Sequence, residues 1–215
     1  MRVFLTGNDG YLGSLLAPEL MKRGHDVIGL DTGFYQEGTL YRSGPMTALT
    51  LVKDLRHVEA KDLKGVEAIV HMAELSNDPA CQLAPQITYE INHKGSVRLA
   101  ELAREVGVRR FIYMSSCSVY GVSDQEFVNE ESPLNPQTAY AKCKTLVERD
   151  VSPMADDGFS RNCVNGSYMS SCAFSRTTSW MSASVRSGNS WRRAASMCAA
   201  GLGGTGDDHF VASAR

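Results

Sequence analysis

The stretch that most constrains the fold is RVFLTGNDGYLG, residues 2–13, in which an apolar run meets three glycines. Gly7, Gly10 and Gly13 allow a tight turn, a close approach of the backbone to a bound group, and close packing of a helix on a strand. The segment YLGSLLAPELMKRG follows at once and has helical character. The spacing therefore predicts a strand, a glycine-rich turn and a helix, in that order.

The rest of the chain up to residue 150 repeats this alternation. Four more apolar runs have the character of strands, VIGL, LTLV, EAIVHMA and RFIYMSS, and a long helical segment covers residues 85–106. Strands that alternate with helices indicate crossover units and a parallel sheet covered on both faces. We therefore predict an α/β fold with a doubly wound parallel sheet, truncated at about residue 150.

The composition changes sharply after that residue. From 151 to 215 there is no Lys, Glu or Ile, and only 8 of the 65 residues are Leu, Val or Phe. That share is below the roughly 20% at which a packed core becomes difficult to form. We expect residues 151–215 to be an irregular tail rich in Ser, Ala and Arg. One hypothesis for so sharp a change is a shifted reading frame.

The bulk properties exclude some partners. A net charge of −2 and a pI near 6.2 do not suggest a nucleic-acid partner. The N-terminal apolar run is too short for a signal peptide, and no stretch approaches the roughly 20 apolar residues of a membrane span. The six cysteines form no CxxC pair and no cluster with histidine. We therefore expect no metal site, no membrane contact, and free thiols in a reducing cytoplasm.

The glycine-rich turn is a candidate dinucleotide site because of the helix that follows it and the acidic residue after the next strand. A purely structural turn is the alternative. A phosphate there would accept hydrogen bonds from the helix N-terminus, with Tyr11 and Leu12 as the expected donors. Asp31 ends the next strand, 21 residues after Gly10. A carboxylate at that place accepts hydrogen bonds from a ribose 2′-hydroxyl and repels a 2′-phosphate. The sequence therefore favours NAD over NADP.

The ends of the third and fourth strands supply more candidates, because ligands of such sheets bind outside the carboxyl ends of the strands. Asp54 and Leu55 end the third strand, where an adenine is expected. Met72 and Ala73 end the fourth strand, beside the expected pyrophosphate. We interpret His71, at the end of the same strand, as a histidine satisfied by its neighbours.

A tyrosine and a lysine form the next candidate pair. Residues 138–144 read TAYAKCK and place Tyr140 and Lys144 four positions apart, on one face of a helix that Thr138 would cap. By itself this spacing is typical of an ordinary solvated face. Ser116, at the end of the fifth strand, precedes Tyr140 by 24 residues, enough for a loop to bring the chain back beside it.

Together these pieces resemble the extended short-chain dehydrogenases/reductases, the nucleotide-sugar epimerase and dehydratase family. The resemblance covers residues 1–150 and is carried by TGNDGYLG, Asp31, HMAELS, Asn92 in EINHKGSVRLAELA, SSCSVYG and YAKCK. It implies a Rossmann fold and tightly bound NAD. It also implies a catalytic set of Ser116, Tyr140 and Lys144, with Lys144 on the nicotinamide ribose and Asn92 steadying the nearby backbone or a water.

The chemistry of this set accounts for the spacing of its members. A phenol has a pKa of about 10, too high for a base at neutral pH. A lysine one turn away, together with the cationic nicotinamide, would stabilise the phenolate of Tyr140 and lower that pKa. Tyr140 would then take a proton from a sugar hydroxyl while hydride leaves the same carbon for NAD. Ser116 would hold the sugar oxygen.

The resemblance also bears on the reaction. The family's 4,6-dehydratases place Asp and Glu directly after the Ser/Thr, where this chain has Cys117 and Ser118, so dehydration is disfavoured. We favour epimerisation at C4 of a UDP- or dTDP-hexose. A reductase or dehydratase of the same family and an inactive NAD-binding remnant stay as alternatives, since the tail lacks the family's Arg-x-x-x-x-Tyr-Gly pattern. A homodimer through the helices after the fourth and fifth strands is also implied.

Overall fold

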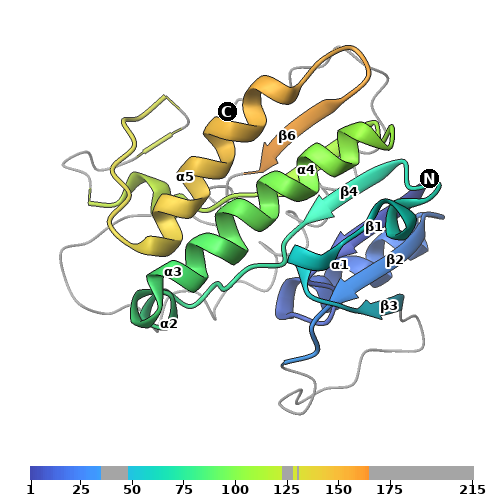
Figure 1. Cartoon of the computed structure of the whole chain (residues 1–215), viewed down its shortest axis with the longest axis horizontal. Helices are drawn as coiled ribbons and strands as arrows, with labels where there is room; N and C mark the ends of the chain where they lie inside the picture. Colours follow the sequence, from blue (N-terminus) through green and yellow to red (C-terminus); the bar gives the residue numbers. More distant parts are fainter. Residues whose placement is uncertain (35–47, 123–127, 130, 165–215) are drawn as a thin grey trace.

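One parallel sheet organises the molecule. The computed structural model describes residues 1–34, 48–122, 128–129 and 131–164. Within them the strand order is β3-β2-β1-β4-β5-β6, and each neighbouring pair is parallel (Figure 1). The strands are β1 (Arg2–Thr6), β2 (Asp26–Asp31), β3 (Leu49–Val52), β4 (Ala68–His71), β5 (Arg110–Met114) and β6 (Ser160–Val164). The direction of winding reverses between β1 and β4, where ligands of doubly wound sheets bind.

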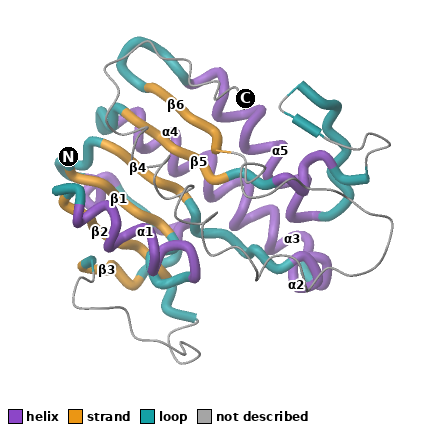
Figure 2. Tube along the Cα trace, turned by 180° about the vertical axis from the view of Figure 1, so that it is seen from behind, coloured by secondary structure: helices purple, strands orange, loops and turns teal. Residues whose placement is uncertain are grey.

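Helices cover both faces of this sheet. Helix α1 lies on one face, and α4 and α5 lie side by side on the other (Figures 1 and 2). The helices are α1 (Tyr11–Lys22), α2 (Asp78–Leu83), α3 (Pro85–Thr88), the π-helix η4 (Tyr89–Gly95), α4 (Ser96–Glu105) and α5 (Ala139–Val151). Short 3-10 helices are η2 (Leu55–His57), η3 (Ala60–Leu63), η5 (Cys117–Tyr120) and η6 (Ser152–Met154).

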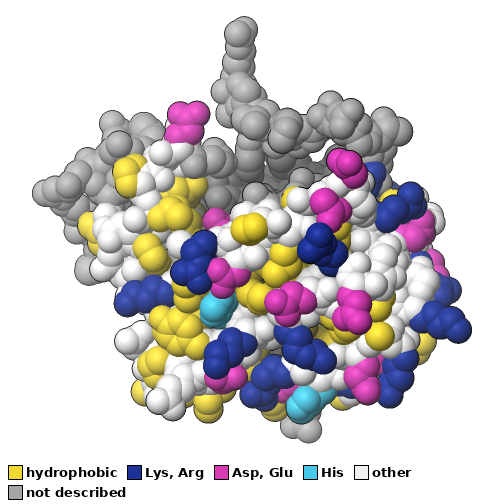
Figure 3. Space-filling view, turned by 45° about the horizontal axis from the view of Figure 1, so that its top comes forward, with side chains coloured by type: hydrophobic (Ala, Val, Ile, Leu, Met, Phe, Trp, Pro, Cys, Tyr) yellow, Lys and Arg dark blue, Asp and Glu magenta, His cyan; other side chains and the backbone are white. Residues whose placement is uncertain are grey.

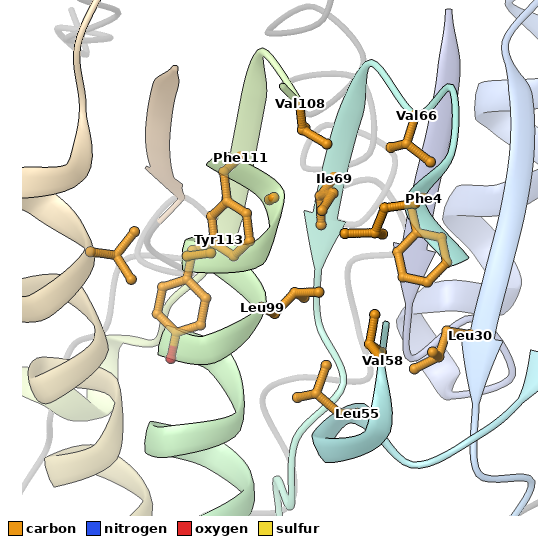
Figure 4. Packing of buried hydrophobic residues seen from close by; sticks show 14 of the residues in the cluster. Phe4, Leu30, Leu55, Val58, Val66, Ile69, Leu99, Val108, Phe111 and Tyr113 are labelled. Atoms are coloured by element: carbon orange, nitrogen blue, oxygen red, sulfur yellow. The ribbon is translucent and has the colours of Figure 1, made fainter. Parts of the chain in front are cut away.

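The core has one layer on each side of the sheet, because successive strand residues point to opposite faces. In β1, Val3 and Leu5 pack with Leu16 and Leu20 of α1, whereas Phe4 packs into the other layer. Figure 4 shows that second layer, in which Phe4, Ile69 and Phe111 of neighbouring strands meet Leu99 of α4. The predicted α/β fold and its five strands are therefore confirmed.

Residues 151–164 correct the expectation that the chain is irregular from residue 151 on. Helix α5 continues to Val151, and β6 then pairs with the edge of β5. The strand forms because its backbone groups complete the sheet, as when Ser160 N donates to Arg109 O at 2.8 Å. Phe159, 2% exposed, packs on Phe111. The remainder of the expected tail, 165–215, lies outside the described residues.

The surface carries both signs of charge. On the face drawn in Figure 3, Lys and Arg side chains alternate with Asp and Glu, in keeping with the small net charge. Exposed ion pairs among the described residues include Arg2 with Asp26 and Arg104 with Asp156. Among the described helices, none combines the length and apolar character that a membrane span requires.

Candidate active site

The glycine-rich turn between β1 and α1 is closed tightly against β4. Gly7 has φ +76°, and a Cβ there would lie 3.0 Å from the Ala73 backbone nitrogen. A Cβ on Gly13 would lie 2.1 Å from the Gly7 carbonyl oxygen, so only glycine fits. Gly10 is the N-cap of α1 without a side-chain cap, and the first turn contains no acidic residue. The helix thus presents its N-terminal N–H groups, including those of Tyr11 and Leu12, without an opposing carboxylate inside that turn.

Asp31 stands at the end of β2 and joins the same turn. Its Oδ2 accepts a hydrogen bond from the Asp9 N–H at 3.1 Å, and its Oδ1 accepts one from Gly33 N at 2.9 Å. The carboxylate is therefore held at the edge of the glycine-rich turn, where the sequence analysis expected it.

The two residues expected near an adenine, Asp54 and Leu55, have different surroundings. Asp54 caps η2 and pairs with Arg56 at 2.7 Å, and this contact is the main reason its pKa is lowered. Leu55 is 4% exposed and its side chain belongs to the core layer of Figure 4. An adenine at this place would therefore contact the backbone of Leu55, not its side chain.

A chain of hydrogen bonds runs from β1 through His71 to α4. Thr6 Oγ1 accepts from the N–H groups of Met72 and Ala73, both at 3.1 Å, so its own proton goes to His71 Nδ1 at 2.7 Å. The Nε2–H of His71 then donates to Ser96 Oγ at 2.7 Å. Burial, with a smaller contribution from Lys144, lowers the pKa of His71 to about 3. His71 is thus a neutral, satisfied histidine, as interpreted from the sequence.

Asn92 secures the loop that follows β4. It lies in the π-helix η4, within the helical segment predicted over 85–106, and its side chain is buried. Its Oδ1 accepts from Leu75 N and its Nδ2 donates to Leu75 O, each at 2.8 Å. Asn92 therefore holds both backbone groups of residue 75. The π-helix that positions Asn92 was not predictable from the sequence.

Ser116 and Tyr140 come together as predicted. Thr138 caps α5 by accepting from Ala141 N at 3.1 Å, which sets the start of the helix that carries Tyr140. The Ser116 hydroxyl accepts from Ser118 N at 3.2 Å and from Ser118 Oγ at 3.0 Å. Ser116 also acts on the Tyr140 hydroxyl in the direction that lowers the pKa of the phenol.

Lys144 lies next to Tyr140 and is almost completely buried. It is 3% exposed, and its Nζ lies 5.3 Å from the centre of the Tyr140 ring. It donates to the Met114 carbonyl, interacts with the Tyr140 hydroxyl and forms an ion pair with Glu74 at 2.7 Å. Burial acts to lower the pKa of Lys144, but the charges of Glu74 and Tyr140 outweigh it and raise that pKa.

In the protein without a nicotinamide, the pKa of Tyr140 is raised. Burial of the phenol is the largest effect and Glu74 adds to it, whereas Lys144 acts to lower this pKa, as predicted, and Ser116 acts in the same direction. The protein alone therefore does not acidify this tyrosine.

Glu74 is the site residue that sequence reasoning missed. It stands in the HMAELS motif directly after β4, but only the fold shows that its side chain turns inward to Lys144. The one available signal was an acidic residue in an otherwise apolar run that follows a buried strand.

The fold and this arrangement define a class of protein: a Rossmann-fold dinucleotide-binding protein with a serine, a tyrosine and a lysine beside the cofactor edge. The model of the NAD dependent epimerase/dehydratase family matches residues 3–184. The chain belongs to this family, and its cofactor is NAD.

Individual relatives agree with the family. A UDP-glucose 4-epimerase of Mycolicibacterium smegmatis is 33% identical over 69% of this chain and 49% of its own length. The Thermus thermophilus UDP-glucose 4-epimerase, solved with NAD, is 26% identical with TM-score 0.67, over 76% of this chain and 54% of that one. An NAD-dependent NDP-hexosamine 5,6-dehydratase of tunicamycin biosynthesis has the same identity and TM-score, over 76% and 53%. The chain spans about half the length of the curated relatives it matches.

Proposed function

We propose that this chain is the cofactor-binding and catalytic part of an NAD-dependent nucleotide-sugar 4-epimerase. The observation that carries the proposal is the contact of Ser116, Tyr140 and Lys144 at the carboxyl edge of the sheet. Two of these residues sit one turn apart on α5 and the third follows β5. The 4-epimerase names of several relatives support the choice of reaction.

The residues at the switch point fit NAD. Side chains are absent at Gly7, Gly10 and Gly13, and the first turn of α1 carries no acid, so a pyrophosphate has access to the helix N-terminus. Asp31 borders that turn and has the acceptor oxygens that a ribose 2′-hydroxyl needs. Met72 and Ala73 line its other side through the Thr6 contact.

The protein's part in the reaction follows from the three side chains. NAD, when bound, takes up and returns the hydride. Tyr140 removes the proton of the sugar hydroxyl, Ser116 donates a hydrogen bond that favours the charged oxygen, and Lys144 supplies positive charge. Lys144 opposes the burial that raises the pKa of Tyr140, and the positive charge of a bound nicotinamide would act in the same direction.

A sugar-nucleotide dehydratase is the second candidate, favoured by the likeness to the NDP-hexosamine 5,6-dehydratase. Against it, the positions after Ser116 are Cys117 and Ser118, which provide no carboxyl group. An inactive NAD-binding remnant is the third, because the sequence after residue 150 lacks the Arg-x-x-x-x-Tyr-Gly pattern that the resemblance leads us to expect. We expect the protein in the cytoplasm, in line with the free thiols of Cys81 and Cys143.

Turnover of UDP-glucose by the purified, NAD-saturated protein tests the proposal. We expect the appearance of UDP-galactose, and a loss of at least about 100-fold in turnover for Tyr140→Phe, the scale of acid–base catalysis. Lys144→Met should also reduce turnover. Its matched control is Lys142→Met, which replaces an exposed lysine on the same helix. Activity that survives Tyr140→Phe would contradict the proposed base, and bound NAD without turnover of any nucleotide sugar would favour the remnant.

A further inference from the structure

Glu74 lies inside the proposed catalytic set, although the mechanism above gives it no part. Its side chain is 2% exposed, and its Oε2 is 2.7 Å from Lys144 Nζ. The Tyr113 hydroxyl donates to the other oxygen, Oε1, at 2.7 Å. Figure 4 shows the Tyr113 ring at one end of the core layer, with its hydroxyl directed away from the apolar side chains. The carboxylate is thus held by a hydrogen bond at Oε1 and by an ion pair at Oε2.

The ion pair stands close to the groups of the proposed reaction. Lys144 donates a hydrogen bond to the Met114 carbonyl, and its Nζ lies 2.7 Å from Glu74 Oε2. The centre of the Tyr140 ring is 5.3 Å from the same nitrogen. A ribose hydroxyl that binds Lys144 would therefore meet an ammonium group already paired with a carboxylate.

Glu74 and Lys144 set the charge balance inside the site. His71 of β4 is neutral, and Tyr113 of β5 keeps its proton because burial and Glu74 raise its pKa. Asp78 of α2 acts on Tyr140, and Glu148 of α5 acts on Tyr113, both with negative charge. The nearby thiol of Cys143 is also uncharged, because burial raises its pKa to about 12.

We propose that Glu74 is a positioning residue of the catalytic set, whose carboxylate holds Lys144 and offsets its charge, so that the Tyr140 phenolate forms less readily than beside an unpaired ammonium. The inference rests on the proposed function, but the ion pair itself is a contact in the structure. Two opposite charges 2.7 Å apart present a dipole, not a full positive charge, to a third group. The direction agrees with the rise that Glu74 causes in the pKa of Tyr140.

The test is an NMR titration of the protein with isotope-labelled tyrosine, in which the Tyr140 signal is assigned by its loss in Tyr140→Phe. In Glu74→Gln, we expect the Tyr140 midpoint to fall by at least about one pH unit, a tenfold rise in its ionisation constant. The matched control is Glu90→Gln, which removes an exposed carboxylate paired with Lys94 and leaves the midpoint unchanged. A midpoint in Glu74→Gln that is unchanged or higher would overturn the inference.

A second variant covers a failure of Glu74→Gln to fold, since breaking a buried pair is costly. In Lys144→Met, with glutamate labelled instead, the titration midpoint of Glu74 should rise by more than one pH unit, because its positive partner is gone. An unchanged midpoint would overturn the inference. Both titrations require neither substrate nor turnover, so they succeed or fail independently of the proposed reaction.

Discussion

At the scale of single residues, the site places ionisable groups where water cannot reach them. His71 and Lys144 are both within the interior, at 0% and 3% exposure, yet they carry different charges. His71 is surrounded by the hydroxyls of Thr6 and Ser96, which satisfy a neutral ring. Lys144 faces a carboxylate and a carbonyl, which satisfy an ammonium. The partners therefore decide which buried group keeps its charge.

This difference predicts how stability depends on pH. The folded pKa of His71 is about 3, below the unfolded value of 6.5, so its contribution is present above pH 6.5 and is lost as the pH falls towards 3. In His71→Gln, the slope of unfolding free energy against pH in this window should be shallower by up to about 1.4 kcal/mol per pH unit. Urea unfolding at several pH values measures it. The control His57→Gln, at an exposed position, should keep the parent slope; equal slopes in all three proteins would contradict the assignment.

At this scale we could predict Tyr140, Lys144 and Ser116 because their motifs, YAKCK and SSCSVYG, resemble those of the family. The i, i+4 spacing on a helix then explained why the tyrosine and the lysine share one face. Glu74 could not, because its role depends on a side chain that turns under the chain after β4. The raised pKa of Tyr140 was likewise hidden, since the amount of burial is a property of the packed structure.

At the scale of elements, α5 sets the geometry of the site. Thr138 accepts from Ala141 N and donates to Asp78 Oδ1 at 2.5 Å, so the cap also ties α5 to α2. The buried face of the helix then carries Cys143, Lys144 and Val147 inward. The cap was predicted from the sequence, whereas its link to α2 was not, because the two residues are 60 positions apart.

Removal of this cap should weaken the helix and displace the site residues. We expect Thr138→Ala to lower the unfolding free energy by about 1 kcal/mol, the usual effect of losing an N-cap. Thr145→Ala in the same helix is the control, because its hydroxyl donates only to the Ala141 carbonyl and caps nothing. Chemical denaturation of the three proteins gives the comparison, and a Thr138→Ala protein as stable as the Thr145→Ala protein would refute the role of the cap.

At the scale of the whole molecule, the alternation of strands and helices was sufficient to predict the sheet, since parallel strands require crossover connections and bury both faces. Strand β6 was not predicted, because its pairing depends on backbone groups at the edge of β5 and not on an apolar pattern. The homodimer through α4 and α5 stays a prediction. The sheet brings the glycine-rich turn, the β4 loop and α5 to one edge, which is the arrangement that the proposed function requires.

The most direct test is a crystal structure of the protein with NAD bound. We expect the pyrophosphate at the N-terminus of α1, a ribose on Asp31, and the nicotinamide next to the Tyr140 hydroxyl, with Lys144 in contact with Tyr140. NAD bound away from this edge, or a Tyr140 hydroxyl directed away from the nicotinamide, would contradict the proposed site.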